Sequence, residues 1–293
     1  MQHVVSKPGQ SSQIQGTSIK VDRVDVWIDN LVWVLWREDS DLVWVVDGPD
    51  ADAVLAWCKT RGKRLAGILN THTHPDHIGI NRALARSGQL DDLRVIGPAK
   101  VADQIPGLTE AVSDGDTIQI LGETVRVWLT EGHLDGHVSY LVGDALFCGD
   151  TLFAGGCGYL FDGPPQTMFE TLCRLAELPG QTQVYCAHEY TQDNLRFAWF
   201  IEPDNAVLAG RIRQAWATRA EGACTVPSTV EEERATNPFL RPGSPTILRR
   251  LGELDCLPEP ATDGSVFAAL RKLKDGGPHK HLEDSTLPLI EPS

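Results

Sequence analysis

The stretch Thr71-His72-Thr73-His74-Pro75-Asp76-His77 decides how the rest of the chain is interpreted. It places four metal-binding side chains within six residues, directly after the apolar run at 65–69. Imidazole and carboxylate groups are costly to crowd beside a hydrophobic core unless a cation neutralises their lone pairs. The stretch therefore predicts a divalent metal centre at the end of a buried strand.

Length, charge and cysteine content narrow the class of protein. The chain has 293 residues, 42% of them hydrophobic, which is enough for one large domain or for a domain with a smaller companion. Its formal net charge of -14 argues against nucleic-acid binding, which needs a basic surface. The seven cysteines include no Cys-x-x-Cys pair, which favours a reduced, cytoplasmic chain. No apolar run is long enough to span a membrane, and we expect a monomer.

Short β-branched and aromatic runs alternate with amphipathic stretches through the first two thirds of the chain. The runs predict strands at 24–28, 31–36, 42–46, 65–69, 117–121, 124–129, 138–142 and 184–186. The amphipathic stretches predict helices at 51–61, 77–86 and 166–178. Strands that come first as a hairpin-like series and then between helices favour an α/β (α+β) fold, in which two packed sheets are flanked by helices.

The pattern changes after about Tyr190, where helical periods at 194–201, 206–219 and 265–274 replace the strands. We therefore expect three parts. These are a flexible N-terminal extension at 1–20, a catalytic domain at 21–190 and a mainly helical domain at 191–293.

Further ligand candidates follow strands outside the opening stretch. His72 and His74 are two residues apart, so in extended backbone they project to the same side and can bind one ion. His133, Asp150 and His188 each come shortly after a predicted strand. Strand ends on one edge of a sheet converge, so these distant groups can complete one site.

Seven ligand groups are too many for one tetrahedral ion and suit two ions that share a carboxylate. We assign to the first ion the side chains of His72, His74 and His133. We assign to the second ion the side chains of Asp76, His77 and His188. Asp150 is the carboxylate that bridges the two ions. Nitrogen and oxygen ligands fit zinc, iron or manganese.

Several residues have more than one interpretation. A single histidine is more often a core or surface residue than a ligand, so the cluster at 72–77 carries the prediction. For His137 we favour a hydrogen-bonding role behind the ligands over direct ligation. Asp47 either supports a ligand or begins a turn, and the sequence favours neither. We expect the remaining histidines to be exposed to solvent: His3, His279 and His281.

The predicted centre points to hydrolysis. Two ions that share a water lower its pKa from about 15.7 towards about 7, so that a metal-bridging hydroxide can act as the nucleophile. We name Asp76 and Asp150 as the catalytic side chains beside that hydroxide. The chain contains no Gly-x-Ser-x-Gly motif and no cysteine with an obvious base, so a side-chain nucleophile is not indicated.

These motifs resemble a known family. The stretch at 71–77 is similar to the T-H-x-H-x-D-H signature of the metallo-β-lactamase fold. The runs at 148–158 and 185–191 resemble glyoxalase II, the hydroxyacylglutathione hydrolases. The resemblance implies an αββα catalytic domain with a C-terminal helical domain that binds glutathione. It also implies cleavage of S-lactoylglutathione to lactate and glutathione, a step of methylglyoxal detoxification, by a binuclear centre in which zinc is our first expectation.

Carried over by position, the family's metal ligands fall on the same seven residues. Its glutathione contacts fall on Tyr190, Arg271 and Lys274, and Tyr159 stands where many members have Lys or Arg. Phe161 replaces a tyrosine found in some members, and Asp135 places an extra carboxylate near the expected metals. Three rivals remain: a mononuclear iron glutathione persulfide dioxygenase on the same fold, another hydrolase of that fold, and a non-catalytic glutathione or metal-binding protein.

Overall fold

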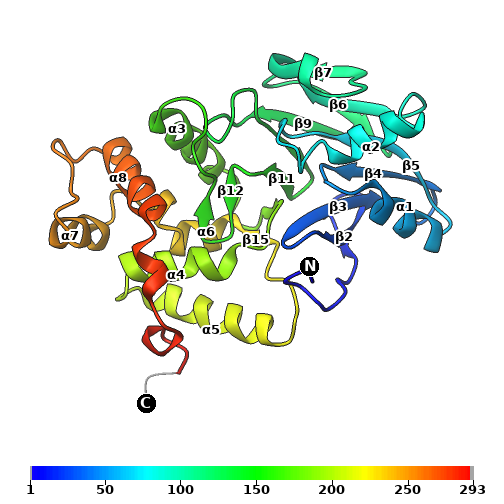
Figure 1. The fold of residues 1–293 in the computed structure, drawn as a ribbon. Helices are drawn as coiled ribbons and strands as arrows, with labels where there is room; N and C mark the ends of the chain where they lie inside the picture. Colours follow the sequence, from blue (N-terminus) through cyan, green and yellow to red (C-terminus); the bar gives the residue numbers. More distant parts are fainter. Residues whose placement is uncertain (1, 291–293) are drawn as a thin grey trace.

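Two β-sheets pack face to face, and a helical region lies at one end of them in the computed structural model, which describes residues 2–290 (Figure 1). The first sheet has the order β1-β2-β3-β4-β5-β6-β7, the second β15-β14-β11-β10-β9-β8, and β12 and β13 form a small hairpin. The strands are β1 (Ser12–Gln13), β2 (Lys20–Val26), β3 (Asn30–Trp36), β4 (Leu42–Val46), β5 (Arg64–Leu69), β6 (Arg94–Pro98), β7 (Glu110–Val112), β8 (Thr117–Ile120), β9 (Glu123–Leu129), β10 (Val138–Val142), β11 (Ala145–Gly149), β12 (Leu152–Phe153), β13 (Gly156–Cys157), β14 (Gln183–Cys186) and β15 (Ser228–Thr229). The α-helices are α1 (Ala51–Thr60), α2 (Gly79–Ser87), α3 (Pro165–Ala176), α4 (Thr191–Ile201), α5 (Ala206–Ala220), α6 (Val230–Thr236), α7 (Pro245–Glu253) and α8 (Asp263–Gly276).

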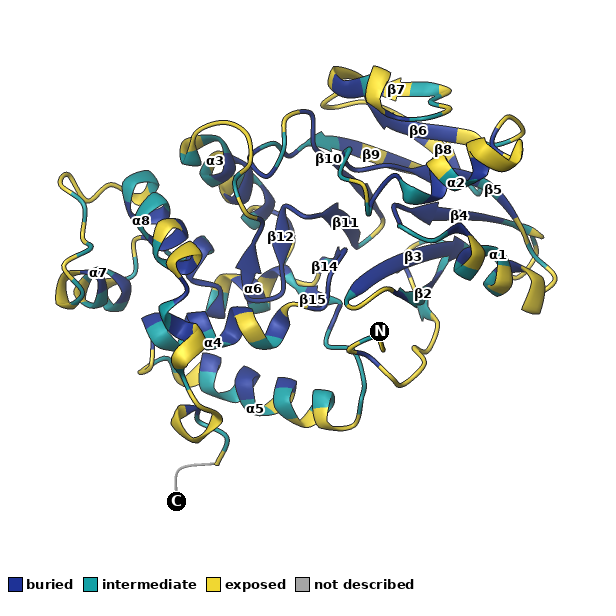
Figure 2. Ribbon diagram, in the orientation of Figure 1, coloured by how far each residue is buried: buried dark blue, intermediate teal, exposed yellow. Residues whose placement is uncertain are grey.

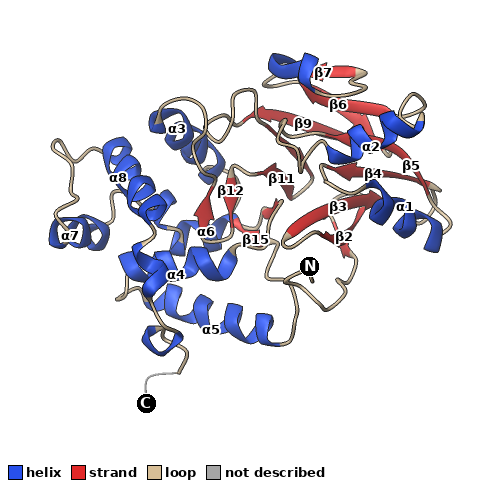
Figure 3. Ribbon diagram, viewed as in Figure 1, coloured by secondary structure: helices blue, strands red, loops and turns tan. Residues whose placement is uncertain are grey.

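The hydrophobic core explains this layering. Leu35 of the first sheet and Tyr140 of the second belong to one buried cluster between the sheets. A second cluster joins the outer face of the first sheet to α1 and α2, with Val54 and Ile80 fully buried. Helix α3 packs Leu172 into the main cluster, so the strands lie between helices (Figures 2 and 3). Burial of both sheet faces gives the predicted αββα fold, which is confirmed.

The site lies at one edge of the two sheets because of strand direction. β4, β5 and β6 run parallel, and β11 runs parallel to β14. β9 and β11 both pair antiparallel with β10, so they share a direction as well. The carboxyl ends of β5, β9, β11 and β14 lead into the segments that carry the predicted ligands.

Two predicted elements next to the ligand stretch and its cavity have other bounds than the sequence predicts. The strand predicted at 24–28 stops at Val26, and Trp27 takes a left-handed φ of 55° in the turn that follows. The helix predicted at 77–86 begins only at Gly79, because the amides of His77 and Ile78 donate to the carbonyl of His74 in a tight turn. The first turn follows β2, and the second lies within the stretch that carries the proposed ligands.

Residues 2–20 are packed rather than free, in contrast to the expected flexible extension. Val5, Ile14 and Ile19 are buried, and β1 pairs with β2. The amide of Val4 donates to the carbonyl of Ile28 across 2.7 Å. Three apolar residues spaced through a Gln- and Ser-rich segment are enough to hold it against the first sheet.

The helical region joins the sheets through buried polar contacts. Glu233 of α6 is fully buried and accepts hydrogen bonds from the amide of Gly155 at 2.8 Å and from Asn237 Nδ2 at 3.0 Å. Arg211 of α5 pairs with the same carboxylate. The boundaries proposed at residues 20 and 190 stay predictions. None of the helices within residues 2–290 combines the length and the apolar character that a membrane crossing requires.

Candidate metal centre

The first group of ligand atoms comes from the ends of three strands. His72, His74, His133 and Asp150 offer donor atoms that all lie within 4.8 Å of one another. His133 Nε2 lies 3.1 Å from His74 Nδ1, and the imidazoles of His72 and His74 are edge to face at 4.8 Å between centroids. The spacing of two residues puts these two histidines on one side of the chain, as the sequence predicts.

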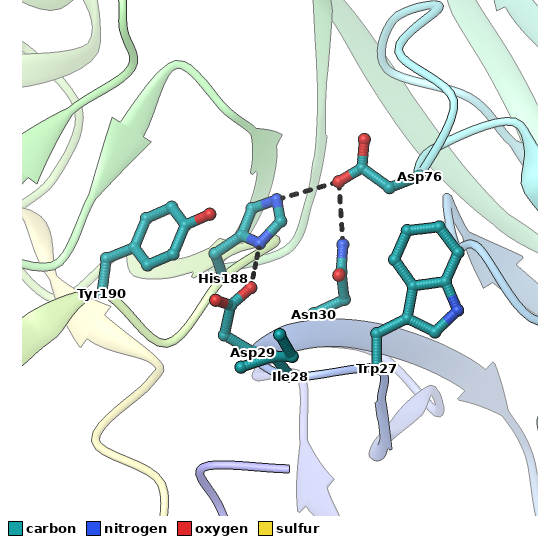
Figure 4. A pocket seen from close by; sticks show the side chains of 7 residues that line it. All are labelled: Trp27, Ile28, Asp29, Asn30, Asp76, His188 and Tyr190. Carbon is teal, nitrogen blue, oxygen red and sulfur yellow. Dashed lines mark hydrogen bonds and ion pairs between the residues drawn. The ribbon is translucent and has the colours of Figure 1, made fainter. Parts of the chain in front are cut away.

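The second group lies beside the first. Asp76, His77 and His188 also offer donor atoms within 4.8 Å of one another. Asp76 Oδ2 is 3.4 Å from His77 Nε2 and 3.4 Å from His188 Nε2. Figure 4 shows the imidazole of His188 and the carboxylate of Asp76 turned toward each other at the surface of a cavity.

Asp150 stands between the two groups. Its Oδ1 lies 3.5 Å from His77 Nε2 and 3.4 Å from His188 Nε2, whereas its Oδ2 lies 3.6 Å from His133 Nε2. One carboxylate therefore faces a ligand set with each oxygen. This is the arrangement that a carboxylate shared by two ions requires.

The chemistry of these atoms fits divalent cations. His72 Nε2, His77 Nε2 and Asp150 Oδ1 are buried and have no hydrogen-bond partner among the described residues. Buried polar atoms without partners are rare, and a cation satisfies all three at once. Burial lowers the pKa of His72 well below its usual value, which keeps the imidazole neutral and its lone pair available. Burial opposes ionisation of Asp150, but His77 and His188 hold the pKa of its carboxyl well below its usual range. The cluster thus fits a binuclear divalent metal site.

Each imidazole except that of His74 is oriented through its other nitrogen. Nδ1 of His72 lies 3.0 Å from Thr71 Oγ1, Nδ1 of His77 lies 3.0 Å from Asp47 Oδ2, and Nδ1 of His133 lies 2.7 Å from the carbonyl of Tyr159. Nδ1 of His188 lies 3.0 Å from Asp29 Oδ1. These contacts leave Nε2 of each ring facing the centre, and such partners usually strengthen metal binding.

Asp47 fills both roles that the sequence left open. Its φ of 53° makes it a turn residue, and it supports His77. Its carboxylate also accepts from the amide and the hydroxyl of Thr71, at 2.8 and 2.7 Å.

His137 lies behind the ligands, as we favoured. It is buried, stacks on His72 with centroids 4.7 Å apart, and its Nε2 accepts from the amide of Asp150 at 3.2 Å. The adjacent Gly149 has a φ of 48°, and a Cβ there would come within 2.4 Å of Thr71 Oγ1. Glycine is therefore required directly before Asp150.

A cavity of about 570 Å³ opens beside the second group. It is lined by Trp27, Ile28, Asp29, Asn30, Asp76, His188 and Tyr190 (Figure 4). The first four residues, in the turn between β2 and β3 and at the first position of β3, were missed by sequence reasoning. Their only signal is an Asp-Asn pair between two strands, because the bridge between Asn30 and His188 that brings them here is a long-range contact.

The predicted substrate residues are divided between two places. Tyr190 lines the cavity and stacks on His188 with centroids 4.8 Å apart, and Tyr159 is 51% exposed on the loop after β13. Arg271 and Lys274 are buried in α8 and do not line the cavity. Arg271 donates to the carbonyl of Cys157 and pairs with Asp275, whereas Lys274 pairs with Asp193.

Two further expectations are corrected. Asp135 is turned toward Lys100, at 3.1 Å, and pairs there rather than joining the ligand groups. His279 is fully buried instead of exposed, because Asp193 binds its Nε2 at 3.2 Å and Phe197 packs against its ring.

The chain is similar to proteins of known family in both halves of its sequence. Residues 32–188 match the model of the metallo-beta-lactamase superfamily, and residues 189–277 match the model described as hydroxyacylglutathione hydrolase C-terminus. The chain is 47% identical over 257 residues to the hydroxyacylglutathione hydrolase of Gloeobacter violaceus, covering 87% of this chain and 98% of that protein. It is 42% identical over 266 residues to the one from a Shewanella species, covering 88% of this chain and 99% of the relative.

Solved structures share the fold at lower identity. ETHE1 from Myxococcus xanthus gives a TM-score of 0.56 at 23% identity and covers 83% of this chain and 94% of its own. A metallo-beta-lactamase from Staphylococcus aureus gives 0.58 at 17% identity, over 88% and 72% of the two chains. These likenesses support the fold, and the closer sequence relatives and the two matched models identify the family. The chain belongs to the hydroxyacylglutathione hydrolase family, within the metallo-β-lactamase superfamily.

Proposed function

We propose that the protein is a binuclear metal-dependent thioester hydrolase that cleaves S-lactoylglutathione to lactate and glutathione. The observation that carries the proposal is the placement of Asp150, whose two oxygens face separate ligand groups. The relatives named hydroxyacylglutathione hydrolase support the substrate class. In this proposal the protein performs the lactate-forming step of methylglyoxal detoxification.

The seven proposed ligands would hold two divalent ions. All the donor atoms are nitrogen or oxygen, which fits zinc, iron and manganese alike; zinc is our first assignment, and iron and manganese are the alternatives. When bound, the ions supply a water acidic enough to attack a carbonyl at neutral pH, together with positive charge for the developing oxyanion.

The chain's own residues orient the reaction. Asn30, His77 and His188 all contact Oδ2 of Asp76, so we assign its Oδ1 to accept a proton of the attacking water. The water oxygen bonds to the acyl carbon, the carbon–sulfur bond breaks, and the sulfur leaves with the electron pair. A cysteine-type thiol has a pKa of about 8.5, so this leaving group needs no dedicated acid.

We assign the glutathione moiety to the side of the site that carries Tyr190 and Tyr159. Arg271 supports that side by holding the carbonyl of Cys157 at 3.0 Å, two residues before Tyr159. Lys274 and Arg271 would bind a substrate carboxylate in competition with Asp193 and Asp275. We also infer a monomer in a reducing, cytoplasmic compartment, where the seven free cysteines stay thiols.

Metal quantification followed by an S-lactoylglutathione hydrolysis assay tests the proposal. We expect about two ions per chain, as for a two-ion site, together with loss of the thioester. Iron at about one ion per chain, with oxygen consumption on glutathione persulfide, would instead indicate the dioxygenase. Full metal occupancy without turnover of any acyl-glutathione would indicate a binding protein.

A further inference from the structure

We propose that Trp27 and Ile28 form an acyl-group subsite. They would make the enzyme selective for glutathione thioesters whose acyl group carries an aromatic or other large apolar substituent. This inference rests on the proposed thioester hydrolysis and names the part of the substrate that the cavity discriminates.

Exposed apolar side chains gather around the metal centre. Trp27 is 54% exposed and Ile28 is 43% exposed. Across the centre, Phe161 is 59% exposed and lies 4.9 Å from the ring of His74, and Tyr159 packs against it at 4.9 Å. Large apolar side chains that gather at a concave site usually mark a surface that a ligand covers.

The cavity has a polar middle and two apolar ends. His188 and Asn30 lie between Tyr190 on one side and Trp27 on the other, with Asp76 above and Ile28 below, as Figure 4 shows. The scissile carbonyl belongs over the middle, where the proposed ligands are. A thioester therefore extends in both directions from that point.

The orientation of the thioester in the cavity is inferred from the element that lies next to each end of the cavity. Tyr190 directly precedes α4, the first helix of the region to which the glutathione contacts are assigned. Placing the thiol carrier there leaves the acyl group to the opposite end, beside Trp27 and Ile28. The lactoyl group ends in a methyl and is too short to cover an indole ring. A larger apolar substituent would bury more of that surface and gain hydrophobic stabilisation.

The backbone that carries Trp27 and Ile28 is held in place before any substrate binds. Trp27 holds a left-handed φ of 55°, which non-glycine residues seldom adopt. The carbonyl of Ile28 accepts from the amide of Val4 at 2.7 Å, and the carbonyl of Asp29 accepts from the amide of Glu189 at 3.0 Å. His3 Nε2 also lies 3.2 Å from the carbonyl of Asn30. These contacts from both sides hold the backbone of the turn in place, so that only the side chains of Trp27 and Ile28 remain to be ordered when the acyl group packs.

The test compares two substrates on one enzyme. The kcat/KM values for S-mandeloylglutathione, which carries a phenyl ring, and for S-lactoylglutathione are measured on metal-loaded protein. Trp27→Asn removes the indole but keeps a residue that tolerates positive φ. We expect this variant to lower the mandeloyl-to-lactoyl ratio of kcat/KM about tenfold, the scale of apolar-pocket discrimination. Trp27→Phe is expected to retain most of the ratio.

Controls separate this subsite from other effects. Val207→Asn changes an apolar side chain that is 60% exposed on α5, away from the cavity, and should leave the ratio unchanged. Ile28→Ser provides a second variant, expected to lower the ratio in the same direction. If the wild type cleaves both substrates but neither variant shifts the ratio, the subsite is refuted and the hydrolase assignment stands. If the wild type cleaves no glutathione thioester, the proposed function fails instead.

Discussion

Asp47 allows a sharp test of how the metal centre is supported. It is 4% exposed, and its carboxylate accepts from both the amide and the hydroxyl of Thr71 and lies 3.0 Å from His77 Nδ1. Asp47→Ala removes all three contacts. Each buried partner left without a hydrogen bond costs about 1–3 kcal/mol, and an alanine at positive φ adds about 1 kcal/mol.

Asp47→Asn is the matched variant. Asparagine tolerates the φ of 53° and keeps one oxygen for the amide of Thr71, but its amide nitrogen cannot accept a hydrogen from His77. Loss of such a partner typically weakens metal binding by about 10–100-fold. The same amide nitrogen would also replace the acceptor of the Thr71 hydroxyl. We therefore expect Asp47→Asn to lose metal affinity and to lose less stability than Asp47→Ala, which removes all three contacts and strains the turn.

The assay is metal titration against a competing chromogenic chelator, paired with urea unfolding of the metal-free protein. The two measurements distinguish orientation of His77 from stability of the fold. Unchanged metal affinity in Asp47→Asn would refute the reasoning, because the contact between Asp47 and His77 would then have no effect on the ligand. Equal destabilisation by both variants would show that the turn conformation contributes little and that the carboxylate contacts carry the stability, because asparagine tolerates the φ of 53° and alanine does not.

Four further outcomes follow from the site and its supports. Asp150→Ala removes the carboxylate that faces both ligand groups, so elemental analysis should show loss of metal together with turnover; retention of both ions would contradict the bridging assignment. Combined Arg271→Met and Lys274→Met should raise KM more than they lower kcat, and an unchanged KM would exclude both residues from substrate binding. Glu233→Ala removes the fully buried partner of Arg211 and leaves its guanidinium only the partly exposed Glu232 at 3.4 Å, so it should cost up to about 3–5 kcal/mol of unfolding free energy in urea; a loss below about 1 kcal/mol would argue against the buried pair. Chelation should lower Tm in calorimetry because ligands without an ion keep unsatisfied buried atoms, and restored metal should reverse the shift.

The proposed ligands could be predicted from sequence because they obey local rules. His72 and His74 follow the two-residue period of extended backbone, and they come directly after a strand. Asp150 and His188 also follow strands, which converge at one sheet edge once β11 and β14 pair in parallel. The local residue pattern and the geometry of a sheet edge were together enough to predict that these side chains meet.

The supporting residues could not be predicted in the same way. Asp29 reaches His188 only because the turn between β2 and β3 meets the segment after β14, and no local pattern encodes that meeting. His279 is buried by Asp193 and Phe197, which come from a different helix. Tertiary contacts of this kind override the expectation that an isolated polar residue near a chain end is exposed.

The proposed ligands and the groups that orient them come from different parts of the chain. Four proposed ligands lie within the stretch at 72–77, yet the imidazoles are oriented by groups from separate elements: Asp29 between β2 and β3, Asp47 after β4 and the carbonyl of Tyr159 after β13. Strand-end ligands can gather without these groups, but the direction of each Nε2 depends on them. Substitutions at such supports should therefore alter metal affinity and geometry more than they alter the fold. The turn between β2 and β3 also carries Trp27, so one turn both orients a proposed ligand and forms the proposed acyl-group subsite.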